Sequence, residues 1–99
     1  MTDTSSSTTP SDNLAVMINL VMSGPRHGPD KSVFFDHNGT ALPVPRQLGE
    51  TLHQQGGMSA MCQFILELEA ALERRGCKET YERLRELEFC WVGIGHWQA

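Results

Sequence analysis

Three cysteines and four histidines are the side chains best able to bind a metal ion, and their spacing argues against a metal site. No pair of them forms CxxC or HExxH, the spacings that bring two ligands to one ion. Cys90 and His96 share one face of a predicted strand, but they lie about 20 Å apart along an extended chain. We therefore expect no metal and no other cofactor.

Cys62 is the candidate nucleophile, because it lies in the first turn of a predicted helix if Ser59 caps that helix. A helix N-terminus lowers the pKa of a thiol and makes it reactive. Cys62 also belongs to an apolar stripe, and a buried cysteine that acts as a small hydrophobe is the commoner arrangement. The sequence alone leaves the reactivity of Cys62 open.

Asp36 and His37 are adjacent, which suggests a catalytic pair, but neighbouring strand residues point to opposite faces and cannot easily hydrogen-bond to each other. Polar residues of this kind are typical of positions beside a tight turn. The sequence contains no known catalytic motif such as GxSxG or a dinucleotide fingerprint. We predict no catalytic residue, and this favours a protein that is not an enzyme.

Arg26 and His27 lie in a glycine- and proline-rich segment, residues 23–30, that is predicted to be a loop. Glycine beside these cations could cradle an anion. The segment lacks the GxxxxGK[ST] spacing and no helix follows it, so an ordinary connecting loop is favoured.

The C-terminal segment, residues 89–97, alternates with period two and is predicted to be a strand. Gly93 and Gly95 leave a trough between Trp91 and Trp97, which something must approach closely. A packed helix is the favoured occupant of this trough. The alternative is a ligand that stacks on the rings, in a pocket lined by Trp91, His96, Trp97 and Phe34.

Residues 59–75 form the clearest predicted helix, because Met61, Ile65, Leu68 and Leu72 recur at helical spacing. Further apolar residues widen the stripe on both sides, so a small sheet would cover only part of it. We therefore predict self-association, as a dimer or higher oligomer. The predicted interface residues are Phe64, Leu68, Ala71 and Leu72.

The remaining elements complete an α+β fold. Residues 14–22 are predicted to be a strand apolar on both faces, although a helix capped by Asp12 is the alternative. Asn38-Gly39 predicts a hairpin with arms 31–37 and 40–44. Short helices are predicted over 45–55 and 78–88. The expected fold is a small four-stranded, mostly antiparallel sheet, made of an N-terminal meander and the C-terminal strand, with two to three helices packed on one face.

Composition limits the function. The net charge of −4 and the pI of about 5.4 argue against a nucleic-acid or membrane-surface partner. Residues 1–12 are predicted to be a disordered tail and residues 13–99 a single domain. The odd cysteine count and the absence of a secretory pattern indicate the cytoplasm. We predict a non-enzymatic homo-oligomer that binds another macromolecule, with a protein as the candidate partner; the alternative is a small-molecule-binding protein or minor enzyme.

Overall fold

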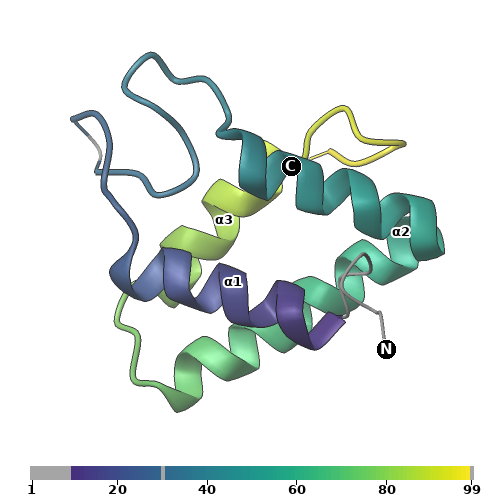
Figure 1. The fold of residues 1–99 in the computed structure, drawn as a ribbon, viewed down its shortest axis with the longest axis horizontal. Helices are drawn as coiled ribbons and strands as arrows, with labels where there is room; N and C mark the ends of the chain where they lie inside the picture. Colours follow the sequence, from purple (N-terminus) through teal and green to yellow (C-terminus); the bar gives the residue numbers. More distant parts are fainter. Residues whose placement is uncertain (1–9, 30, 99) are drawn as a thin grey trace, which may run out of the picture.

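The computed structural model describes residues 10–29 and 31–98. Over these ranges the chain forms three helices, α1 (Pro10–Ser23), α2 (Pro43–Arg74) and α3 (Thr80–Cys90) (Figure 1). The predicted disordered tail lies outside the described residues as far as residue 9, and residues 10–12 begin α1. None of the described helices is long and apolar enough to cross a membrane.

The predicted α+β fold is wrong, because the described residues contain no strand and only two isolated β-bridges, His27 with Ser32 and Phe35 with Ala41. Residues 14–22, the expected central strand, belong to α1. Met17, Ile18 and Val21 share one helical face and are buried there, whereas Val16 is half exposed. A run that is apolar at nearly every position fits both the period of a strand and the period of a helix, and tertiary packing selects the helix.

The predicted hairpin is also wrong: a turn forms near Asn38-Gly39, but Asn38 lacks the positive φ that the predicted two-residue Asn-Gly turn requires. Asp36 N–H donates to the Thr40 carbonyl over 2.9 Å, and Gly39 N–H donates to the Asp36 carbonyl over 3.0 Å. Beyond this turn, the Ser32 hydroxyl accepts the N–H groups of Phe34 and Phe35, each over 3.1 Å. Side-chain acceptors thus satisfy backbone donors that a strand ladder would use, and the segment is a folded loop.

The predicted C-terminal strand is wrong as well. Phe89 and Cys90 end α3, and the chain then turns at Gly93 and Gly95, whose φ values are +96° and +56°. These left-handed conformations suit glycine and are incompatible with an extended strand. Residues 91–98 therefore form consecutive turns that fold back over the helices.

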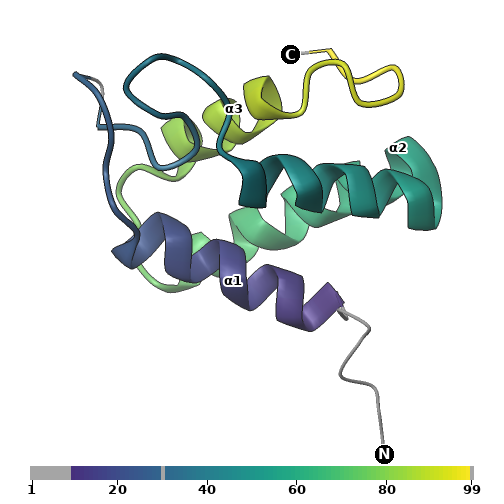
Figure 2. The ribbon, with the colours of Figure 1, turned by 45° about the horizontal axis from the view of Figure 1, so that its top comes forward.

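The predicted helices are confirmed, but two of them are joined in α2. The join falls at Gly56 and Gly57, where the backbone leaves helical geometry (Gly57 φ 68°, ψ −155°). We call residues 43–55 the first arm of α2 and residues 58–74 the second arm. Figures 1 and 2 show the arms folding back on each other at the glycine pair.

The core forms where the second arm meets the other elements. Leu68 and Leu72 are fully buried, and α1 and α3 each contact α2. The second arm therefore obtains cover from helices of the same chain, where the sequence predicted a sheet and a second copy. The buried apolar side chains of this core include Met17, Val21, Phe34, Met61, Phe64, Leu84, Leu87, Trp91 and Trp97.

Candidate functional site

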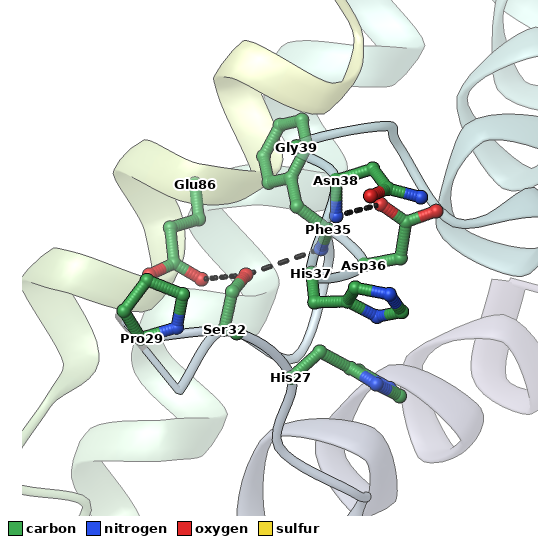
Figure 3. Close-up of a pocket in the computed structure, with 10 residues that line it drawn as sticks. His27, Pro29, Ser32, Phe35, Asp36, His37, Asn38, Gly39 and Glu86 are labelled. Atoms are coloured by element: carbon green, nitrogen blue, oxygen red, sulfur yellow. Dashed lines mark hydrogen bonds between the residues drawn. The ribbon is translucent and has the colours of Figure 1, made fainter.

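A hollow of about 380 Å³ lies between the loop that connects α1 to α2 and the side of α3 (Figure 3). It gathers several polar side chains from the loop and from α3. The side chains that reach it from the loop include His27, Ser32, Asp36 and His37, and α3 contributes Glu86.

The Asp36 carboxylate stabilises the loop. Its Oδ1 accepts the backbone N–H groups of Asn38 over 2.8 Å and Thr40 over 3.0 Å. The Thr40 N–H is the main cause that lowers the pKa of Asp36, followed by the Asn38 N–H and the nearby His37 and His27. The carboxylate is thus ionised and bonded to its own turn, which is an Asx-type structure.

Through its hydroxyl, Ser32 also forms hydrogen bonds that stabilise the loop. Its hydroxyl donates to Glu86 Oε1 over 2.9 Å, while its oxygen accepts the two backbone N–H groups of the loop already described. Glu86 also accepts the buried Arg83 guanidinium over 3.0 Å. These bonds fasten the loop to α3, and they leave Ser32 without a free lone pair to attack a substrate.

The two imidazoles of the hollow, His27 and His37, lie side by side in Figure 3 and point the same way. They do not complete a metal site, because no group of three or more His, Cys, Asp or Glu among the described residues is placed to hold an ion. Arg26 forms an ion pair with Glu79 over 3.0 Å, so its charge is already compensated. An ordinary connecting loop is the interpretation this geometry supports.

The predicted ligand-binding residues are divided between core and surface. Trp91 and Phe34 are fully buried, Trp97 is 7% exposed, and His96 is exposed. Trp91 Nε1–H donates to the Pro45 carbonyl over 2.9 Å. The two indoles meet edge to face with centroids 5.2 Å apart. Trp97 Nε1–H also donates to the Glu88 carbonyl over 3.0 Å, so both tryptophans are satisfied by the protein itself.

The first arm of α2 packs beside Trp91, but the predicted trough between Trp91 and Trp97 does not form, because residues 91–98 make turns in place of a strand. A Cβ atom at Gly49 would lie 2.5 Å from the Trp91 ring, so only glycine allows this approach. Next to this contact, Arg46 donates to the carbonyls of Cys90 over 2.9 Å and Val92 over 2.6 Å. The first arm therefore holds the end of α3 in place.

The predicted interface residues are buried within one chain: their exposed fractions are at most 2%, for Phe64, Leu68, Ala71 and Leu72. The apolar flank beside them, which includes Cys62 and Leu66, is exposed. Burial raises the pKa of the Cys90 thiol to about 11, while Arg46 lowers it by a smaller amount. Cys90 is therefore a protonated core residue at neutral pH.

A second surface, which the sequence interpretation missed, is a groove between α1 and the first arm of α2. Two adjoining hollows of about 290 and 350 Å³ share Val16 and Val44, which are 49% and 56% exposed. We call their combined surface the neutral groove, because none of its lining side chains is charged. The lining residues are Asn13, Val16, Met17, Asn19, Leu20, Ser23, Gly24, Val44, Gln47, Leu48 and Thr51.

The neutral groove was hidden from sequence reasoning because a strand over 14–22 places Val16 in the core with its alternate neighbours. In the helix, Val16 points outward, and the helical period of residues 14–22 was the signal that could have revealed it.

Comparisons with protein-family models, with curated proteins and with solved structures found no match. The fold and the site thus define a small helical domain with an uncharged, apolar groove.

Proposed function

We propose that this protein is a non-enzymatic interaction protein whose neutral groove receives an apolar helix from a protein partner. The observation that carries the proposal is the lack of any charged side chain in the groove, although 20% of the chain is charged. Depletion of charge together with half-exposed aliphatic side chains is typical of the centre of a protein–protein interface.

The shape of the groove favours a helical partner. Val44 lines one end together with Leu20 and Gly24, and Thr51 lines the other end together with Asn13. The two walls are therefore antiparallel helices. The groove follows α1, whose 14 residues extend about 21 Å, and a partner helix of three to four turns matches this length.

Asn13 supplies a polar contact for the partner. Its side chain is 7% exposed, and its amide Nδ2 has no hydrogen-bond partner among the described residues. An unpaired buried donor costs about 1–3 kcal/mol. Because Nδ2 is buried in the unbound protein, a partner acceptor reaches it only if the Asn13 side chain turns toward the groove, and this contact would then recover part of that cost and fix a register.

The remaining features support a protein partner in the cytoplasm. A groove without Lys or Arg has no cation to neutralise nucleic-acid phosphates. The three cysteines are free, which suits the proposed reducing compartment, and the proposed function requires no cofactor. In this proposal the Ser32 and Asp36 hydrogen bonds stabilise the loop and take no part in chemistry.

A synthetic helix tests the groove. The probe is an uncharged helical peptide of about four turns, with leucines at positions i, i+3, i+4 and i+7 and glutamines elsewhere. Titration followed by NMR should shift the resonances of Val16, Leu20 and Val44. Val44→Glu should weaken binding by at least about tenfold, because it buries an unpaired carboxylate against the peptide.

Leu66→Glu is the matched control, because Leu66 is 58% exposed and Val44 is 56% exposed, and Leu66 does not line the groove. This variant should bind the peptide as the wild type does. Shifts confined to other surfaces, equal affinity of Val44→Glu and wild type, or no binding at all would each overturn the proposal.

A further inference from the structure

The outer face of α3 carries a second exposed stripe, separate from the neutral groove. Tyr81, Arg85, Glu88 and Val92 follow one another at intervals of four, three and four residues, which places them along one face of the helix and its final turn. Tyr81 is 79% exposed and Val92 is 43% exposed. The spacing is the same when read in either direction, and the positive Arg85 and the negative Glu88 lie at equal distances from the midpoint.

We propose that a second copy of this chain docks on the stripe, with the two α3 helices antiparallel about a twofold axis midway between Arg85 and Glu88. This axis places Arg85 of each copy opposite Glu88 of the other, and Tyr81 opposite Val92. The contact is isologous, so each favourable pairing occurs twice.

The charges of the stripe are free to pair between copies. On the inner side of α3, Arg83 and Glu86 are separated by three positions and form an ion pair over 3.0 Å. Arg85 and Glu88 have the same separation, yet neither forms an ion pair with any described residue. The Arg85 guanidinium instead lies over the Phe89 ring, 5.9 Å from its centroid.

The proposed twofold axis passes through a concave part of this surface. A hollow of about 240 Å³ lies over the middle of the stripe, lined by Tyr81, Arg85, Glu88 and Phe89. The opposite Arg85 and Glu88 enter at this position in the proposed dimer. A twofold axis through Arg85 itself would place the two Arg85 side chains opposite each other and cause repulsion. Charge therefore selects the register of the two helices as well as the partner.

Charge exchange tests the contact. Arg85→Glu and Glu88→Arg should each weaken the dimer by at least about tenfold, measured by sedimentation velocity, because each opposes like charges twice. An equimolar mixture of the two variants should recover wild-type association, because one copy then presents two glutamates to two arginines. Arg74→Glu and Glu73→Arg are exposed controls with the same changes in net charge, and they should dimerise normally.

Tyr81→Asp provides a variant that does not depend on Glu88, which is half buried. It should also weaken the dimer, and its circular dichroism should remain that of the wild type because Tyr81 is exposed. A wild-type protein that stays monomeric, variants that dimerise normally, or a mixture that fails to associate would each overturn the inference. Peptide binding in the neutral groove does not use these residues, so the two proposals fail separately.

Discussion

At the residue scale, the polar side chains of this protein mainly serve its own backbone. Arg46 binds the carbonyls at the end of α3, and Asp36 and Ser32 bind the N–H groups of the loop between α1 and α2. Asp36 and His37 were expected to fail as a catalytic pair because of strand geometry. The described residues form no strand there. In the structure the Asp36 carboxylate instead accepts hydrogen bonds from the Asn38 and Thr40 N–H groups, and no bond joins it to His37.

The carboxylate of Asp36 predicts a pH dependence. Its pKa in the folded protein lies below the ordinary value of 3.8, so its ionised form stabilises the fold above that value. This contribution is lost as the pH falls through the lowered pKa. Urea unfolding should therefore show Asp36→Ala less stable than the wild type above about pH 5, with the difference shrinking in more acidic solution. A difference that is constant or grows on acidification would contradict this role.

At the element scale, periodicity located the helices and failed for the strands. The second arm of α2 has a stripe that only a helix satisfies, and glycines mark its ends. Residues 14–22 are apolar at both periods, so single-sequence reasoning lacked the packing that decides between them. The groove was missed for the same reason, since Val16 is exposed only in the helix. The period-two pattern in residues 89–97 includes Gly93 and Gly95, and these glycines form turns with positive φ.

The bend in α2 yields a second prediction. Gly57 has φ 68° and ψ −155°, a region accessible essentially to glycine alone, and a Cβ there would meet nothing within 4 Å. Gly57→Ala should therefore lower the free energy of unfolding by about 1–3 kcal/mol through backbone strain alone. Thermal unfolding monitored by circular dichroism measures this change.

Chemical synthesis provides the control for the bend. A chain with D-alanine at position 57 should be at least as stable as the wild type, because a D-residue favours positive φ. If D- and L-alanine destabilise the protein equally, the backbone conformation at Gly57 is not the cause.

At the scale of the whole molecule, one core made by all three described helices determines stability. Leu68, which the sequence predicted to lie in an interface between copies, is fully buried at the centre of this core, and Leu68→Glu would place a carboxylate there. The structure favours unfolding, because a carboxylate there has no described cation to pair with and water is excluded. A loss of about 3–5 kcal/mol is a large part of the stability of a domain of this size.

Leu66→Glu, two positions earlier on the exposed side of the same helix, is the control and should change stability by no more than about 0.5 kcal/mol. Tryptophan fluorescence reports the difference, since Trp91 and Trp97 are buried and become solvated on unfolding. Equal melting temperatures for the two variants would show that Leu68 does not face the core.

The glycine pair in α2 also helps to prevent the chain from exchanging one arm of α2 with a neighbouring copy. A straight helix of 32 residues would be about 48 Å long, which exceeds the longest dimension of the molecule, 43 Å. The two arms can therefore share one core only while α2 stays bent. Straightening the bend would send one arm into the core of a neighbouring molecule, so replacing both glycines with helix formers should convert the protein into an intertwined, domain-swapped assembly.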